Sequence, residues 1–245
     1  MTKKLDGFRF KQFQIEHSLC AMKVGTDGIL LGSWAEPGPS TKLLDIGTGS
    51  GLLAIMLAQK SPCEAKIYGI DIDAAAIKQA CHNAAECPWP SKLSFDVLPI
   101  QSLPANQQYD FIISNPPFFV AKRGELAPAD ANYMTTTRRQ ARHLDSLNLD
   151  QLMQAVRGCL SPQGQFNCIL PAQAKQIDEL AEAHGLYCQR RTWVFSKANK
   201  PAIRQLLCFS KFQNDILQDN LVIHTDAGGY SDSYKQLCQG FYLNF

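Results

Sequence analysis

The sequence predicts an α/β protein with a mostly parallel sheet of seven strands, one of them antiparallel, and with helices on both faces. Short apolar runs, each followed by a polar or glycine-rich turn and then mostly by a helix-like segment, recur between residues 43 and 184. Two further apolar runs, 186–195 and 203–212, are separated only by a short basic connection. We therefore expect these two runs to form an antiparallel pair that closes the sheet.

The chain has 245 residues, of which 45% are hydrophobic, so one domain with a sizeable core is expected. Residues 1–40 should form an arm and a first helix packed on a core of residues 41–245, giving a single compact domain. No apolar stretch reaches the roughly 18 residues of a membrane span, and the first residues lack the apolar segment of a secretory signal. These features predict a cytoplasmic protein without membrane contact, and we expect a monomer.

The nine cysteines contain no Cys-x-x-Cys pair. This spacing argues against a zinc site or a redox motif, and no metal is expected.

The chain begins with a segment of mixed polarity that carries Phe8, Phe10 and Phe13, and a short hairpin or arm is expected there. Residues 22–28 then precede an apolar run, 29–34, that predicts a helix. Thr26 or Asp27 is the candidate cap of that helix.

Residues 43–51 read Leu-Leu-Asp-Ile-Gly-Thr-Gly-Ser-Gly and precede the apolar run 52–58, which predicts a strand, a turn and a helix. Gly47, Gly49 and Gly51 allow the backbone to approach a ligand closely. In a parallel sheet this turn lies at the carboxyl end of the strand, where ligands bind. The spacing differs from the Gly-x-Gly-x-x-Gly of dinucleotide sites, and no lysine follows as in a P-loop, which argues against NAD and nucleoside triphosphates.

The second strand, 66–71, ends in Asp71, whose carboxylate can accept both hydroxyls of a ribose. Asp73 is the expected cap of a helix over 74–85. The third strand, 93–98, runs into a proline and has no acid at its end.

The fourth strand, 111–113, is followed by Asn115-Pro116-Pro117-Phe118. Proline stops the strand and keeps the residue before it extended, so Asn115 should project from the strand end. The carbonyls of Asn115 and Pro116 can accept two N–H bonds of a planar group, and Phe118 can stack on its ring. The alternative is a stiff turn without a ligand.

Residues 120–147 have few periodic apolar positions and predict a long loop, which carries Arg138, Arg139 and Arg142. Asn148 should cap an amphipathic helix, followed by a strand over 164–170 and a helix over 171–184. A short helical pattern lies in the tail, at 230–242.

Cations are unevenly distributed, although the formal net charge is only +2. Residues 189–211 contain six Lys or Arg and no acid, with Lys197 and Lys200 in the connection between two strands. Together with the arginines of the long loop, this stretch suits a polyanion. The alternative is an ordinary solvated basic surface.

The order of elements, the Asp45-Ile-Gly-Thr-Gly-Ser-Gly51 turn and the Asn115-Pro-Pro-Phe118 motif resemble those of the class I S-adenosylmethionine-dependent methyltransferases, which have a Rossmann-like sheet. The match covers nearly the whole chain. Phe10–Phe13, Met22–Gly28 and Phe241–Leu243 are similar to blocks of the bacterial tRNA(Val) (adenine-N(6))-methyltransferases. That family modifies the adenine just 3′ of the anticodon.

The resemblance implies that S-adenosylmethionine is the cofactor and tRNA the partner, and it implies roles for individual residues. Asn115 and Pro116 would hold the target amino group, and Phe118 would stack on the target base. The implied cofactor-binding residues are Lys23, Gly25, Thr26, Asp45, Gly47, Gly49, Gly51, Asp71 and Asn115. The implied substrate-binding residues are Pro117, Arg138, Arg139, Arg142, Lys197 and Lys200.

The chain departs from the family at one position, and two other functions remain as alternatives. The family has an acid at the end of the third strand, where this chain has Leu98-Pro99, so a backbone group, Asp96 or another group must contact the cofactor's adenine. The same chemistry suits guanine in ribosomal RNA or a glutamine amide of a protein, although the basic stretch favours RNA. A noncatalytic RNA-binding protein with this fold is the alternative of another class.

Overall fold

The computed structural model describes residues 7–20, 23–104, 107–116, 148–174 and 176–245, together with the backbone of 119–120 and 126–127. Five predicted site residues lie outside the described residues, namely Pro117, Phe118, Arg138, Arg139 and Arg142. In the described part of the chain, no helix is long and apolar enough to cross a membrane.

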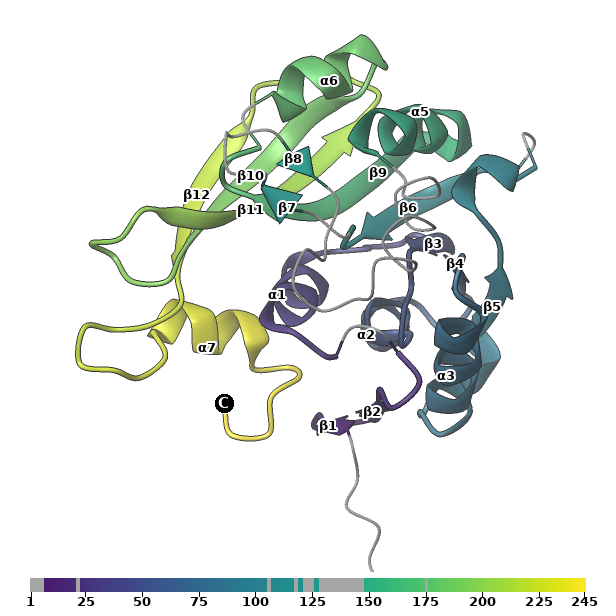
Figure 1. The fold of residues 1–245 in the computed structure, drawn as a ribbon, viewed down its shortest axis with the longest axis horizontal. Helices are drawn as coiled ribbons and strands as arrows, with labels where there is room; N and C mark the ends of the chain where they lie inside the picture. The colour runs from purple at the N-terminus through teal and green to yellow at the C-terminus, as the bar shows by residue number, and fades with distance from the viewer. Residues whose placement is uncertain are drawn as a thin grey trace, which may run out of the picture.

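An eight-stranded sheet forms the centre of the molecule (Figure 1). Its strands are β3 (Lys42–Ile46), β4 (Lys66–Asp71), β5 (Leu93–Val97), β6 (Tyr109–Ser114), β9 (Leu160–Pro171), β10 (Tyr187–Phe195), β11 (Ala202–Ser210) and β12 (Leu217–Val222). The strand order is β12-β10-β11-β9-β6-β3-β4-β5. β11 is antiparallel to both of its neighbours, and all other pairs are parallel.

Helices cover both faces of this sheet (Figure 1). One face carries α1 (Thr26–Trp34), α2 (Leu52–Lys60), α3 (Ala74–Ala85) and α7 (Asp232–Cys238). The other carries α5 (Leu149–Cys159) and α6 (Ile177–Ala183). Short elements complete the described chain: the pairs β1 (Gly7–Arg9) with β2 (Gln14–Glu16) and β7 (Phe119–Val120) with β8 (Leu126–Ala127), and 3-10 turns at Pro90–Lys92 and Ile100–Ser102.

The predicted α/β class, the single antiparallel strand and the helices on both faces are confirmed, but the predicted number of seven strands is wrong. The additional strand, β12, pairs in parallel with β10 at the outer edge of the sheet. Residues 217–220 of this strand are exposed and include Gln218, Asp219 and Asn220. These three polar residues separate two short apolar runs, Ile216-Leu217 and Leu221-Val222-Ile223, so no continuous apolar run marks the strand. Its pairing with β10 orders it.

The central strands β3 and β6 are buried on both sides, which explains their continuous apolar runs. Leu43, Phe111 and Ile113 face the core that includes α1 and α2. Leu44 and Ile112 face the second core, against α5 and α6. This alternation fixes which side of each strand faces which helices.

Two predicted helix caps are confirmed and one is wrong. Asp73 accepts a hydrogen bond from the Ala75 amide at 2.9 Å and caps α3, and Asn148 forms a capping box with Gln151 at the start of α5. Helix α1 instead begins after Gly25, which provides no side-chain cap. Asp27 lies inside the first turn of α1, and its carboxylate accepts a hydrogen bond from Arg204 of β11.

The N-terminal hairpin, β1–β2, is attached to the glycine-rich turn through one side chain of α3. The Asn83 amide donates to the carbonyl oxygens of Glu16 and Ser50, both at 2.8 Å, and its oxygen accepts from the Glu16 amide at 3.0 Å. Phe10 and Phe13, between the two strands, are buried and stack at 4.6 Å between ring centroids. The arm is therefore held beside the turn that follows β3.

Candidate active site

A cavity of about 710 Å³ lies at the edge of the sheet where the parallel strands end. Ligands of parallel α/β sheets bind at this edge, and the volume suits a small-molecule site. Its wall combines the start of α1, the turn after β3, the end of β6 and the outer strands. The residues that line it include Lys23, Gly25, Thr26, Asp27, Gly47, Thr48, Gly49, Asn115, Pro116, Ser196, Ile203, Arg204, Ile223, His224, Tyr230 and Tyr234.

The turn after β3 presents backbone rather than side chains to the cavity. Gly47 and Gly49 have φ of +70° and +53°, and a Cβ added to either would meet nothing within 4 Å. The amides of Gly47 and Thr48 donate to the Ile70 carbonyl oxygen at 2.9 and 3.0 Å, which fixes the turn to β4. Gly47 and Gly49 thus lie where their prediction places them.

Gly51 lies outside this cavity. Its φ is +81°, and an added Cβ would lie 3.2 Å from the Cβ of Ala80. Glycine is required there because α3 packs closely against the start of α2. This packing role differs from the cofactor contact predicted for Gly51.

Asp45 lies beneath the turn and is fully buried. Its Oδ2 accepts hydrogen bonds from the Thr48 hydroxyl at 2.7 Å and from the Ala54 amide at 3.1 Å. Its Oδ1 has no hydrogen-bond partner in the described part of the chain. Burial raises the pKa of this carboxyl from 3.8 to about 7, although both hydrogen bonds act in the opposite direction. Asp45 therefore orders the turn from below and does not line the cavity.

Asp71, at the end of β4, also supports the turn and is not among the residues that line the cavity. Its Oδ2 accepts from the Gly49 amide at 2.9 Å, and its Oδ1 accepts from the Asp73 amide at 3.0 Å. Beside it the sequence analysis missed two apolar side chains at strand ends, Ile72 and Val97, which are 56% and 51% exposed. The sequence could have indicated them by position. Ile72 directly follows the acid that ends β4, and Val97 is the last residue of β5.

Asp96 lies away from the candidate site. The Tyr68 hydroxyl donates to its Oδ2 at 2.8 Å, and both residues line a separate cavity with Lys42 and Lys66. The side chain faces the opposite side of β5 from Phe95, which packs against the glycine-rich turn. Asp96 therefore faces away from the candidate site, and this position argues against a contact with the cofactor's adenine.

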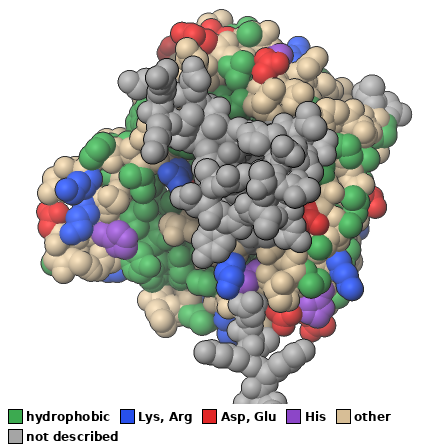
Figure 2. All heavy atoms as spheres, viewed as in Figure 1, with side chains coloured by type: hydrophobic (Ala, Val, Ile, Leu, Met, Phe, Trp, Pro, Cys, Tyr) green, Lys and Arg blue, Asp and Glu red, His purple; other side chains and the backbone are tan. Residues whose placement is uncertain are grey.

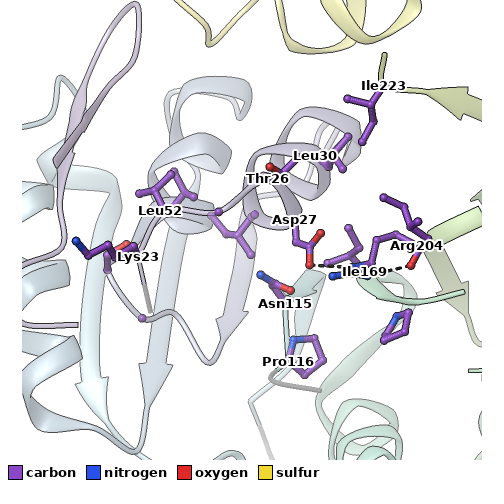
Figure 3. Close-up of a pocket in the computed structure, with 18 of the residues that line it drawn as sticks. Lys23, Thr26, Asp27, Leu30, Leu52, Asn115, Pro116, Ile169, Arg204 and Ile223 are labelled. Atoms are coloured by element: carbon purple, nitrogen blue, oxygen red, sulfur yellow. Dashed lines mark hydrogen bonds and ion pairs between the residues drawn. The ribbon is translucent and has the colours of Figure 1, made fainter. Parts of the chain in front are cut away.

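Asn115 and Pro116 line the middle of the cavity, beneath the start of α1 (Figure 3). The end of β6 is fixed because the buried Ser114 hydroxyl donates to the Ile46 carbonyl oxygen at 2.9 Å. Asn115 is half-buried, and its carboxamide makes no hydrogen bond to any other described residue. This amide is therefore available to a ligand at the position that the sequence predicted.

Lys23, Gly25 and Thr26 line the same cavity from the amino-terminal side, as predicted. Opposite Thr26 the structure reveals an ion pair that the sequence analysis missed (Figure 3). Arg204 Nε lies 2.9 Å from Asp27 Oδ2, and its NH1 group donates to the Ile203 carbonyl oxygen at 2.9 Å. This pair joins α1 to β11 across the cavity. No local pattern indicates it, because the two residues are far apart in the sequence.

The basic stretch 189–211 is largely occupied by contacts within the protein. Arg190 lies 4.5 Å from the Trp34 ring centre, and Arg191 binds Asp178 at 2.5 Å. Arg204 binds Asp27, and Lys211 donates to the Leu160 carbonyl oxygen at 2.5 Å. Of the six cations, Lys197 and Lys200 alone have neither an ion pair nor a side-chain hydrogen bond among the described residues. Neither lines the cavity, but both follow Ser196, which does.

No group of three or more potential metal ligands occurs among the described residues.

Comparison with known proteins gives a consistent assignment. The profile of a family described as "Methyltransferase domain" matches residues 37–220. A tRNA1(Val) (adenine(37)-N6)-methyltransferase of Aeromonas hydrophila is 42% identical over 97% of each chain. A protein of the same name from Bacteroides fragilis is 38% identical, over 96% of this chain and 97% of its own.

A solved structure shares the fold at low sequence identity. It is described as a predicted O-methyltransferase from Agrobacterium tumefaciens, and it superposes with a TM-score of 0.62 at 15% identity. The superposition covers 88% of this chain and 96% of that one.

Proposed function

The chain belongs to the methyltransferase-domain family and, within it, to the tRNA1(Val) (adenine(37)-N6)-methyltransferases, and from this premise we propose its reaction. It transfers a methyl group from S-adenosylmethionine to the exocyclic N6 atom of adenine 37 in a valine tRNA. The observation that carries the proposal is the carboxamide of Asn115, which no other described residue binds, in the same cavity as the backbone of Gly47 and Gly49. An acceptor for an amino group thus lies beside a cradle for a cofactor.

The residues of the cavity, together with the ends of β4 and β5 beside the glycine-rich turn, fit S-adenosylmethionine. Side chains at Gly47 and Gly49 would project into open space, so the glycines leave room for the methionine part. Asp71 has one further lone pair on each oxygen for ribose hydroxyls. The exposed faces of Ile72 and Val97 suit an adenine ring, and a nearby backbone group takes the place of the missing acid.

S-adenosylmethionine, when bound, supplies an electrophilic methyl group, so the protein's task is to present the nucleophile. The lone pair of N6 is delocalised into the adenine ring and is weakly nucleophilic. The side-chain oxygen of Asn115 and the carbonyl oxygen of Pro116 would accept its two N–H bonds. These acceptors favour a pyramidal nitrogen and stabilise positive charge that develops only in the transition state. A fixed β6 end keeps the nitrogen aligned with the methyl group.

The remaining assignments are part of the same proposal. Phe118 stacks on the target base and Pro117 contacts the substrate. Arg138, Arg139 and Arg142 bind RNA phosphates with Lys197 and Lys200. Residues 1–40 complete the cofactor side of a single domain whose core is 41–245. The enzyme acts in the cytoplasm, because its tRNA substrate is found there, and it acts as a monomer. An anticodon loop presents the base unstacked at low cost.

The test is methyl transfer from labelled S-adenosylmethionine into unmodified valine tRNA, with Asn115→Ala as the inactive control. Recovery of the label as N6-methyladenosine at position 37, and its loss in the variant, would support substrate, product and motif together. Cofactor binding without transfer to any tRNA would reject the proposal, and ribosomal RNA and protein amides would then be assayed.

A further inference from the structure

We propose that His224 and Tyr230 form a stacking site for a second RNA nucleotide beside the target adenine. Lys197 and Lys200 bind the phosphates next to that nucleotide. This inference rests on the function proposed above and specifies how the same cavity holds its RNA.

The sheet topology places these groups in line with Asn115. β9, β10 and β12 run parallel to β6, so their carboxyl ends lie on the same edge of the sheet. The cavity continues along this edge from Asn115 to Ser196, His224 and Tyr230. A nucleotide chain bound at Asn115 can therefore follow the cavity towards β12.

The rings at this end form a column that rises from the core to the surface. Tyr234 is fully buried, and its ring is stacked with that of Tyr230 at 5.0 Å and 21° between ring planes. Tyr230 is 39% exposed and is stacked with His224 at 5.1 Å and 24°. Tyr230 lies between the other two rings of this column, so an unpaired base would stack on the outer face of His224, which Tyr230 supports from below.

The loop that carries His224 and Tyr230 is braced before any ligand binds. The Thr225 amide donates to the Gly229 carbonyl oxygen at 2.9 Å, and the Ser231 amide donates to the Ile223 carbonyl oxygen at 2.9 Å. The His224 amide donates to the Ser196 carbonyl oxygen at 3.0 Å, which ties this loop to the β10–β11 connection. Binding a base there costs little loop entropy, because the platform is already formed.

Charge on the adjoining connection suits a phosphate backbone. Lys197 and Lys200 follow Ser196 closely and are not engaged by an acid among the described residues. Figure 2 shows Lys, Arg and His side chains at the left, together with Asp or Glu, next to a hydrophobic area. A base on the rings and phosphates on the lysines together match a single-stranded RNA segment.

The experiment uses the anticodon stem-loop of valine tRNA with the fluorescent base 2-aminopurine on either side of adenine 37, one RNA for each side. Stacking on the rings should quench the fluorescence of one of these RNAs with wild-type protein. Tyr230→Leu and His224→Ala should abolish that quenching and raise the RNA KM roughly 5- to 100-fold, with kcat and the Kd of S-adenosylmethionine little changed. Tyr230→Phe keeps the ring and should match wild type, as should His184→Ala at the end of α6.

Salt dependence tests the lysines. In Lys197→Ala and in Lys200→Ala, the slope of the logarithm of the RNA association constant against log salt concentration should become shallower. The change should be about 0.7 for each phosphate that no longer binds a lysine. Thermal unfolding and cofactor binding show whether each variant is folded. If Tyr230→Leu does not fold, the stacking site is tested with His224→Ala alone.

Two failures are distinguishable. If wild type methylates no tRNA, the proposed function fails, and this subsite fails with it. If wild type methylates tRNA but His224→Ala and Tyr230→Leu bind and quench the labelled RNAs as wild type does, the stacking site alone is rejected. A raised RNA KM with unchanged quenching would also reject stacking.

Discussion

Asp27 in the first turn of α1 and Arg204 near the start of β11 are joined across the active-site cavity, with 2.9 Å between Oδ2 and Nε. Each side chain is 36% exposed, so solvent screens the pair. Its contribution to the free energy of unfolding should be below about 1 kcal/mol.

Arg204→Ala and Asp27→Ala should therefore lower the rate of methyl transfer while changing the free energy of unfolding only slightly. The rate should fall because the pair positions the start of α1. A double-mutant cycle in urea, with transfer rates measured in parallel, checks this. A destabilisation of more than about 2 kcal/mol in each single variant, beyond what an exposed pair provides, would instead assign the pair a mainly structural role.

Gly49→Ala should weaken cofactor binding at least tenfold. An alanine at φ of +53° costs about 1 kcal/mol of backbone strain, and its methyl group would project into the cavity. Gly38→Ala is a matched control, since Gly38 has φ of +55° and open surroundings but lies outside the cavity. Calorimetric titration with S-adenosylmethionine should separate the two variants, and equal affinities would place the cofactor elsewhere.

The buried carboxyl of Asp45 should make the free energy of unfolding fall as pH rises from about 4 to about 7. The unfolded chain releases this proton near its ordinary pKa of 3.8, whereas the folded protein holds it up to about 7. Asp45→Asn should flatten this part of the pH profile in chemical denaturation.

Thr48→Val should have the opposite effect on the same profile. It removes a hydrogen bond that lowers the pKa of Asp45, so the fall should extend above pH 7. Unchanged profiles in both variants would show that Asp45 does not titrate in this window.

Thr192→Val should destabilise the protein by about 1–3 kcal/mol, whereas Thr192→Ser should be close to wild type. The Trp34 indole donates to the Thr192 hydroxyl at 2.7 Å in the core between α1 and β10. Valine keeps the shape but leaves the indole N–H without an acceptor. Urea denaturation of the two variants measures the difference, and equal stabilities would show that water replaces the missing hydroxyl.

The sequence predicts the elements whose signals are local. Asp73 and Asn148 are followed by helical patterns, and each caps its helix as expected. Asn115 lies in the cavity because the apolar run before it and the prolines after it fix its place at a strand end.

Non-local relationships escaped prediction. β12 has a polar centre, Gln218-Asp219-Asn220, between two short apolar runs, and its pairing with β10 orders it. The Arg204–Asp27 pair and the proximity of His224 and Tyr230 to Asn115 depend on which strands become neighbours. Spacing along the chain does not encode that order. It also does not show which side of β5 Asp96 occupies, because that depends on how β5 packs.

The position of β12 at the edge of the sheet has a consequence for self-association. An outer strand offers unpaired backbone amides and carbonyls to other chains and can seed aggregation. Here the strand has six residues, and its exposed part includes the polar residues Gln218, Asp219 and Asn220. The Asp219 carboxylate also lies 3.8 Å from the Arg190 guanidinium. Desolvating that charge would oppose the addition of a further strand, so the polar residues that hid β12 from sequence analysis also help to keep separate molecules apart.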